Sequence, residues 1–352
     1  MRKRWSVLVL LIAALLIMTM VTACGSNSQN DKNNTGSKIN ETQNNENQNS
    51  NRKPIRVTFA GSSPGGVWYM VMSGVAETIN RSFPGSAITV VPGDGVANVT
   101  RVAQNQAQIG LTHSAIAASA ITGGDPFKQK IDNIATIASL YPSQLQFVVT
   151  KKLGVNSIDE IISKKLPIKV SVDAPGSTGE LAFRRMINEY GITYDDIKKW
   201  GGQVIFKNMG DSSDMLSDGF LDGFSTMTLA PASPIQEASV NKDLVMLPIK
   251  EEVINKLVEK YGYGKGEVPA KTYKFNDSAI PTITSYTVVI VPKDAPEELA
   301  YNISLSINEN LEYLKTVHVA LKELTPDKLV ENLGAPLHKG AEKYYREIGV
   351  LK

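Results

Sequence analysis

Two glycine-rich turns are the stretches of this sequence whose residue types suit ligand binding. Residues 61–69 (GSSPGGVWY) follow an apolar strand pattern at 55–60, and residues 173–179 (DAPGSTG) follow another at 168–172. Each turn precedes a predicted amphipathic helix, so backbone N–H groups and the positive end of a helix dipole would collect there. Such a turn suits a carboxylate or a phosphate. The alternative, that the glycines serve only backbone geometry, stays open.

Candidate ligand contacts come from these turns and from the ends of neighbouring predicted strands. Serine and threonine hydroxyls add donors, an asparagine amide offers a donor and an acceptor, and aromatic rings can cover an aliphatic part of a ligand. The candidate ligand-binding residues are Ser62, Ser63, Gly65, Gly66, Trp68, Tyr69, Asn98, His113, Ser114, Gly176, Ser177, Thr178 and Thr226. For Trp68, Tyr69 and His113 a structural role in the core is the open alternative.

Charged side chains outside the turns are expected to contribute little to ligand binding. Arg184 and Arg185 lie about two turns into their predicted helix, where we expect them to be solvated. Charge neutralisation would then fall to helix dipoles and hydroxyl donors. His338 is expected to be structural or to support a residue that contacts the ligand.

Length, charge and composition restrict the class of protein. A chain of 352 residues with 42% hydrophobic residues is long enough for two domains, each with its own core. A formal net charge of +2 without a basic stripe argues against a nucleic-acid binder. The single cysteine and three widely spaced histidines argue against a thiolate or histidine metal site. We therefore expect no metal or other cofactor.

The N-terminus has the three-part form of a secretory signal. Arg2, Lys3 and Arg4 precede an apolar run at 7–20, which is short for a stable membrane span. The following VTAC, which ends at Cys24, resembles a bacterial lipobox and implies a lipoprotein signal peptide over residues 1–23 with lipidation of Cys24. An ordinary signal peptide with an incidental cysteine is the alternative.

The polar segment that follows predicts a disordered tether. Residues 24–53 begin with the lipidated cysteine and contain almost no aliphatic side chain, so they cannot bury enough apolar surface to fold. The protein is then expected outside the cytoplasm, attached by lipid to the outer face of the cell membrane.

After the tether, predicted strands and helices alternate, which is typical of an α/β fold with mostly parallel sheets. Strands are predicted at 55–60, 87–91, 109–113, 134–141, 144–150, 168–172, 204–206, 221–226, 244–249 and 285–291, with a loop at 262–276 and one long helix at 299–314. Ser114 is the predicted N-cap of the helix behind it.

Two such α/β blocks and a returning strand predict two lobes joined by hinge strands near 144–150 and 285–291. Lobe 1 would comprise residues 54–148 and 285–352, and lobe 2 residues 149–284. The glycine-rich turns would face each other across a ligand cleft, because ligands bind at the carboxyl ends of parallel strands and between domains.

Four blocks in this order resemble the TAXI family of solute receptors from tripartite ATP-independent periplasmic (TRAP) transporters. The blocks are residues 61–69, 95–98 (GVAN) with 108–114 (QIGLTHS), 174–180 (APGSTGE), and 337–341 (LHKGA) with 344–349 (YYREIG). The resemblance covers residues 55–349. It implies a two-lobed periplasmic-binding-protein-like fold (type II-like) and no enzymatic activity.

The resemblance also implies a receptor that captures a small organic anion, such as glutamate or a related carboxylate, and delivers it to the membrane subunits of a TRAP permease. Two blocks depart from the family. Residues 95–97 (GVA) stand where the family often has a serine before the asparagine, and residues 225–228 (STMT) replace aromatic and small residues. Both are expected to line the cleft, so the exact ligand stays open.

Other functions remain as alternatives. The turns also suit a receptor for a phosphonate or similar oxyanion that serves an ATP-driven importer. A secreted α/β hydrolase is a third reading, although none of the three histidines stands in a recognisable triad context. A ligand-sensing partner of a signalling receptor is a fourth. The chain has no GxxxxGK[ST] motif, so energy coupling would lie in a partner.

Overall fold

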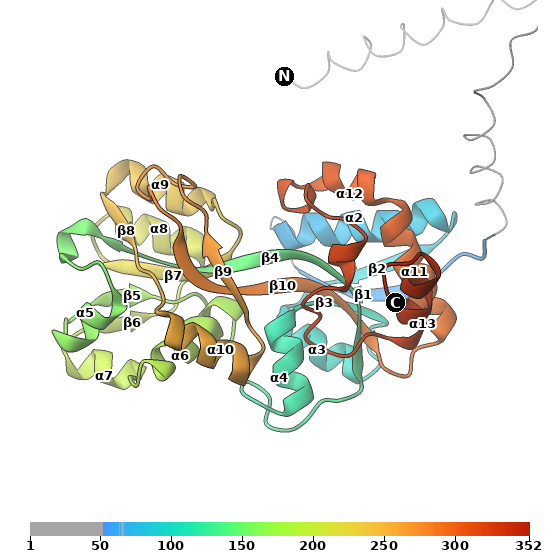
Figure 1. Cartoon of the computed structure of the whole chain (residues 1–352), viewed down its shortest axis with the longest axis horizontal. Helices are drawn as coiled ribbons and strands as arrows, with labels where there is room; N and C mark the ends of the chain where they lie inside the picture. Colours follow the sequence, from blue (N-terminus) through green and yellow to red (C-terminus); the bar gives the residue numbers. More distant parts are fainter. Residues whose placement is uncertain (1–51, 63, 65–66) are drawn as a thin grey trace, which may run out of the picture. The chain divides into compact units, whose positions relative to one another are not determined.

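The computed structural model describes residues 52–62, 64 and 67–352 (Figure 1). The predicted signal peptide, Cys24 and nearly all of the predicted tether lie outside these residues, as do Ser63, Gly65 and Gly66. Within the described ranges, no helix combines the length and the apolar character that a membrane crossing requires.

The described chain alternates strands with helices in the predicted order. The strands are β1 (Arg56–Ala60), β2 (Ala87–Val91), β3 (Ile109–His113), β4 (Ile134–Thr150), β5 (Lys169–Ser171), β6 (Gln203–Ile205), β7 (Gly223–Thr228), β8 (Leu244–Met246), β9 (Gly264–Val268) and β10 (Ile280–Pro292). The helices are α2 (Val67–Ser82), α3 (Gly95–Ala103), α4 (Ser114–Thr122), α5 (Ile158–Ser163), α6 (Thr178–Glu189), α7 (Tyr194–Lys199), α8 (Met209–Ser217), α9 (Ser233–Asn241), α10 (Glu251–Tyr261), α11 (Glu297–Glu309), α12 (Leu311–Val317) and α13 (Lys339–Glu347), with 3-10 turns η1 (Lys151–Leu153), η2 (Val319–Leu321) and η3 (Asp327–Val330).

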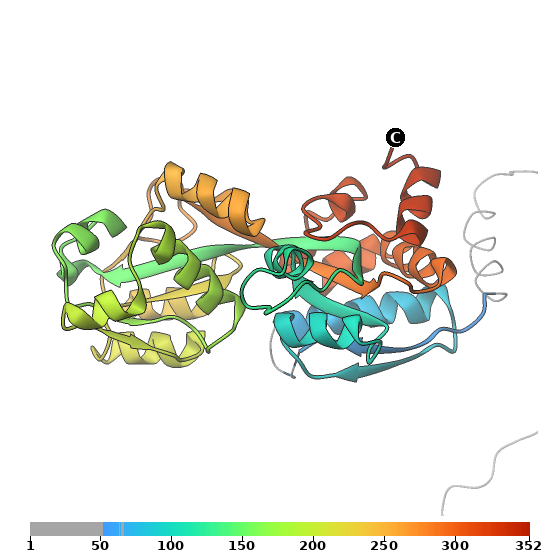
Figure 2. The ribbon, with the colours of Figure 1, turned by 90° about the horizontal axis from the view of Figure 1, so that it is seen from below.

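These strands form one continuous sheet with the order β2-β1-β3-β10-β4-β7-β5-β6, in which β8 also pairs with β4 and β9 with β10. The β1 strand is parallel to β2 and β3, and β5 is parallel to β6 and β7. Between these two parallel groups lie β10 and β4, which pair with each other in antiparallel fashion. Figures 1 and 2 show both strands running through both lobes. The two-lobed α/β fold and the two hinge strands are therefore confirmed.

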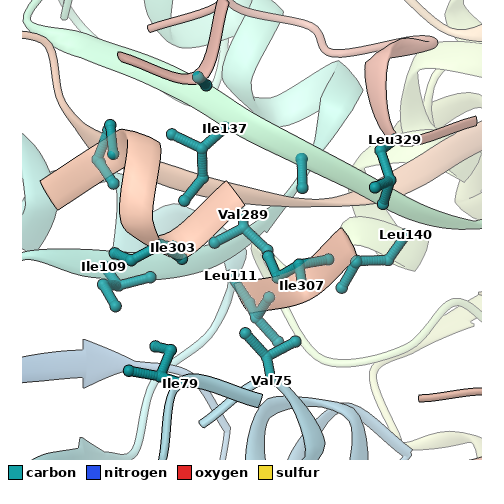
Figure 3. Close-up of a cluster of buried hydrophobic side chains, with 14 of the residues drawn as sticks. Val75, Ile79, Ile109, Leu111, Ile137, Leu140, Val289, Ile303, Ile307 and Leu329 are labelled. Atoms are coloured by element: carbon teal, nitrogen blue, oxygen red, sulfur yellow. The ribbon is translucent and has the colours of Figure 1, made fainter. Parts of the chain in front are cut away.

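Side-chain alternation along the hinge strands places helices on both faces of the sheet. Val289 and Val291 of β10 pack with α2 and α11, whereas Val288 and Ile290 pack with α3 and α4. In lobe 2, α5, α6, α7 and α10 cover one face and α8 and α9 the other. Figure 3 shows part of the lobe 1 core, with Val75, Ile79, Ile109, Leu111, Ile137, Leu140, Val289, Ile303, Ile307 and Leu329 labelled.

Three elements differ from the sequence-based expectation. The predicted strands 134–141 and 144–150 form one strand, β4, because Pro142 lies in register with Tyr286 of β10 and a pairing irregularity follows at 287/288. The predicted loop 262–276 contains β9, which pairs with β10. The predicted long helix is divided at Asn310, whose side-chain amide donates to Ser306 O and Ser82 Oγ.

The prediction that Ser114 caps α4 is wrong. Ser114 is the first residue of the helix, and the preceding residue makes no side-chain cap bond. The Ser114 hydroxyl instead accepts from Tyr286 N at 3.0 Å and lies 3.3 Å from Ser285 Oγ. It therefore joins the start of α4 to the hinge strand β10.

The expectation that Arg185 is solvated is also wrong. Arg185 is only 2% exposed. Its guanidinium donates to Ser119 Oγ of α4 at 2.8 Å, to Asp125 O and to Tyr263 Oη, and it lies 4.7 Å from the ring centre of Tyr261. A buried cation on α6 of lobe 2 therefore contacts α4 of lobe 1.

Arg184, the neighbouring residue, makes more exposed contacts. It pairs with Glu180 at 2.8 Å and with Asp125 at 3.0 Å, and its side chain is 31% exposed. Ion pairs at this exposure contribute about 1 kcal/mol or less. The buried hydrogen bonds of Arg185 are the stronger part of this contact between lobes.

We expect Arg185→Met to lower the free energy of unfolding by about 3 kcal/mol, because hydrogen bonds from a charged donor are lost and their buried acceptors are left unsatisfied. Arg184→Met, the matched control, should lower it by about 1 kcal/mol or less. Urea unfolding measures both. Equal losses in the two variants would contradict a special role for Arg185.

Candidate ligand-binding site

The N-terminal ends of helices from both lobes meet at Gly95, the first residue of α3. A Cβ atom built on Gly95 would lie 3.6 Å from Cη2 of Trp68 in α2 and 3.7 Å from Oγ1 of Thr178 in α6. It would also lie 3.3 Å from Oγ1 of Thr112 in β3. Because helix N-termini carry partial positive charge, this point combines donors from both lobes. It is the centre of the candidate site.

The first predicted turn needs a glycine where it leaves β1. A Cβ on Gly61 would lie 1.7 Å from Sδ of Met72, so no side chain fits there. Gly61 also donates its N–H to Val91 O at 3.0 Å. Ser62 follows, half-buried. The close approach of α2 to the end of β1 therefore explains this glycine.

Asn98 links three segments around this turn. Its amide nitrogen donates to Gly61 O and to Leu111 O, each at 2.9 Å, and the residue is fully buried. Its Oδ1 is buried without a hydrogen-bond partner in the described structure. The amide nitrogen of this predicted ligand contact thus bonds within the protein, and the amide oxygen is buried beside Gly93.

The rings of Trp68 and His113 form a stacked pair, and the Trp68 ring also reaches Gly95. Their ring centres lie 4.8 Å apart, and the Trp68 indole N–H donates to Thr287 Oγ1 of β10 at 3.0 Å. Burial lowers the pKa of His113 to about 4, and a backbone hydrogen bond to Ser285 opposes this shift. The imidazole is therefore neutral near pH 7. Tyr69, the next residue of α2, packs half-buried against the lobe 1 core.

The second predicted turn contains a carboxylate of its own. Ser177 caps α6 by accepting from Glu180 N at 3.3 Å, and the Glu180 carboxylate accepts from Gly176 N at 3.1 Å. Arg184 and Tyr194 also donate to this carboxylate. Gly176 and Ser177, both predicted ligand contacts, are thus bonded within the protein. Thr178 is the second-lobe candidate whose hydroxyl faces lobe 1.

Asp173 is a second carboxylate at this turn. Burial raises its pKa to about 6, and donation from the Thr226 hydroxyl and from Met227 N offsets part of the shift. Its Oδ2 approaches Gly179 closely, since a Cβ atom built on Gly179 would lie 1.9 Å from this oxygen. Thr226, a predicted ligand contact, therefore supports Asp173. The half-buried carboxylate places an acceptor for a cationic group at the end of β5.

The structure brings some of the predicted site residues together and separates others. Trp68 and Thr178 meet at Gly95, whereas Asn98 and Ser114 lie deeper and hold the surrounding strands. Ser63, Gly65 and Gly66 lie outside the described residues. Thr287 and the role of Asp173 were missed, since their partners are distant in sequence. The aspartate preceding the second glycine-rich turn was the one available signal.

Comparison with solved structures gives the class of fold. The chain shares its two-lobed α/β fold with solved structures of ligand-bound proteins. MatC from Rhodopseudomonas palustris with bound malate is similar, with a TM-score of 0.50, 16% identity, and 84% of this chain and 98% of MatC covered. XAC2383 from Xanthomonas citri bound to ATP has a TM-score of 0.51 and 10% identity, with 84% and 96% covered.

The periplasmic binding protein BugD is a further similar structure. Its TM-score is 0.49 at 14% identity, and the match covers 84% of this chain and 95% of BugD. The family follows from the sequence itself. The model of the NMT1-like family matches residues 59–349, and the chain belongs to the NMT1-like family.

The carboxyl of Asp173 should make stability depend on pH in a defined direction. Because its folded pKa of about 6 exceeds its ordinary value of 3.8, the native state gains relative stability below pH 6 and loses it as pH rises through 6. Asp173→Asn tolerates the left-handed backbone (φ 66°) and carries no charge. We expect this variant to be more stable than wild type at pH 8.

Urea unfolding at pH 4.5, 6 and 8 measures this effect. The variant should show a smaller change between pH 4.5 and 8 than the wild type. Asp214→Asn, which removes an exposed carboxyl of α8, serves as the control and should leave the profile unchanged. A wild-type profile in Asp173→Asn would contradict the assignment.

Proposed function

We propose that this protein is an extracytoplasmic solute-binding receptor that captures a small organic anion between its lobes and delivers it to a TRAP permease. The observation that carries the proposal is the meeting of α2, α3 and α6 at Gly95. A ligand held between the two lobes would favour their approach, because it binds the closed arrangement better than the open one.

The chemistry around Gly95 suits a carboxylate better than a highly charged anion. Asp94 caps α3 by accepting from Val96 N and Ala97 N, and Glu180 lies at the start of α6. These protein carboxylates offset part of the positive potential of the two helices. The N-terminus of α2 and the Thr178 hydroxyl are then the main donors for a ligand.

Asp173 supports an amino acid among the possible carboxylates. An ammonium group near this half-buried carboxylate would stabilise its charged form, which burial otherwise disfavours. Glutamate or a related amino acid would thus engage both groups, with its carboxylate at the helix N-termini and its ammonium group at Asp173.

The proposed transport partner and cellular location of the protein are argued from its sequence. The four blocks that resemble TAXI receptors support a TRAP permease as the partner, and the lipobox-like segment before Cys24 supports a lipid anchor on the outer face of the cell membrane. Ion-driven, ATP-independent uptake in proteoliposomes that hold the permease would separate this function from that of an ATP-driven importer.

The receptor for an oxyanion or phosphonate remains the second candidate. The fold does not decide between these ligands, since MatC holds malate and XAC2383 holds ATP. Binding without turnover separates both receptors from a secreted α/β hydrolase. A purified chain that converts its ligand to product would contradict the proposal.

A thermal-shift screen of amino acids, dicarboxylates, 2-oxoacids and phosphonates tests ligand class. A ligand at 100 times its Kd should stabilise the native state by about 2.7 kcal/mol. Thr178→Val, which removes the hydroxyl and keeps the shape, should weaken binding about tenfold through one lost hydrogen bond.

The control is Thr316→Val, which removes an exposed hydroxyl of α12. It should leave affinity unchanged, and both variants should keep the unliganded melting temperature near that of the wild type. Unchanged affinity in Thr178→Val would remove the second-lobe turn from the site. A shift with neutral sugars but with none of the anions would overturn the proposed ligand class.

A further inference from the structure

A cavity of about 860 Å³ lies between the lobes, beside the candidate site. Lobe 1 contributes Val67, Leu140, Ala320 and Leu324 to its wall, and lobe 2 contributes Thr228 and Leu229. Most of these six side chains are aliphatic, whereas His318, Glu323, Lys328 and Glu331 add polar and charged groups to the lobe 1 wall. Pockets of roughly 300–1,000 Å³ with apolar walls hold drug-sized ligands. The cavity therefore offers more apolar room than a compact dicarboxylate uses.

Two residues of the cavity wall are close neighbours of candidate-site residues along the chain. In lobe 1, Val67 precedes Trp68 at the start of α2. In lobe 2, Thr228 lies two residues beyond Thr226 on β7, which places their Cα atoms about 7 Å apart on one face of the strand. Since Thr226 supports Asp173, a ligand held at Asp173 and the α2 N-terminus can extend into the cavity.

One polar group on the cavity wall lacks a partner. Gln144 of β4 lines the cavity, and its Oε1 is buried without a hydrogen bond in the described structure. Buried amide oxygens are nearly always paired in proteins. An unpaired, buried amide oxygen is therefore an unusual feature of this part of the wall.

We propose that this cavity holds an apolar chain or ring of the ligand. The ligand class is then a carboxylate with a sizeable apolar body, either unsubstituted or bearing a 2-amino group, rather than a compact dicarboxylate. This inference rests on the proposed receptor function, which supplies the carboxylate contact at the helix N-termini.

Titration calorimetry of the full chain with two series of ligands tests the inference. The series are straight-chain carboxylates and 2-amino carboxylates of four to ten carbons, with glutamate and malate as compact references. Each buried methylene should tighten binding about fourfold until the cavity is filled. The compact references should bind more weakly than the eight-carbon members.

Two variants fill the cavity from opposite lobes, so that one remains informative if the other fails to fold. Ala320→Phe enters from lobe 1, and Ser233→Phe enters from an exposed wall residue of α9. Each should abolish the gain with chain length while leaving the affinity for the four-carbon ligands within twofold. Val240→Phe adds the same ring at an 81% exposed position and should change nothing.

The outcomes separate this inference from the proposed function. Binding of glutamate or malate without any gain from chain length overturns the inference and leaves the receptor function standing. A gain with chain length that survives in both filled variants places the apolar body elsewhere and also overturns it. Binding of no carboxylate at all overturns the receptor proposal together with the inference.

Discussion

The antiparallel pairing of β4 with β10 is the constraint on which the rest of the structure depends. These strands carry the hydrogen-bonded ladder from one lobe to the other and convert two parallel groups of strands into a single sheet. Parallel strands bring the carboxyl ends of β1, β3 and β5 to the middle of the molecule, because each lobe joins the pair from its own side. The turns after these strands therefore meet where the lobes meet.

Side chains that approach two glycines determine the local form of the candidate site. The Met72 side chain occupies the space beside Gly61, and Trp68 and Thr178 lie at contact distance from Gly95. Donors and carboxylates then share this small space, since Asp94 and Glu180 occupy two of the three helix ends. The arrangement favours a ligand with limited negative charge.

The helix α6 connects the site with the contact between lobes. Its first residue, Thr178, faces Gly95, and two turns later Arg185 is buried against α4. A helix is stiff over this length, so a displacement of one end moves the other. Burying a guanidinium is unfavourable unless its donors are paired, and the bonds to Ser119 and Asp125 O form only while α6 lies against lobe 1. The proposed ligand contact at Thr178 and the lobe contact at Arg185 therefore lie on one helix.

Local sequence patterns predicted most of the architecture. Alternation and 3.6-residue periodicity depend on which faces are buried, so they identified the βα units, both glycine-rich turns and both hinge strands. They failed where tertiary pairing overrides local preference. Pro142 lies within a continuous strand because β10 holds both sides of it, and β9 forms in a polar stretch because β10 offers a free edge.

The sequence by itself determined the class of fold, the two turns and the residue types that could bind an anion. Only the tertiary structure decided which of those groups remain for a ligand. Asn98, Gly176, Ser177 and Thr226 make hydrogen bonds within the protein, and Arg185 is buried. The physical reason is that a donor's availability depends on partners that are distant along the chain, and these are set by strand pairing and helix packing.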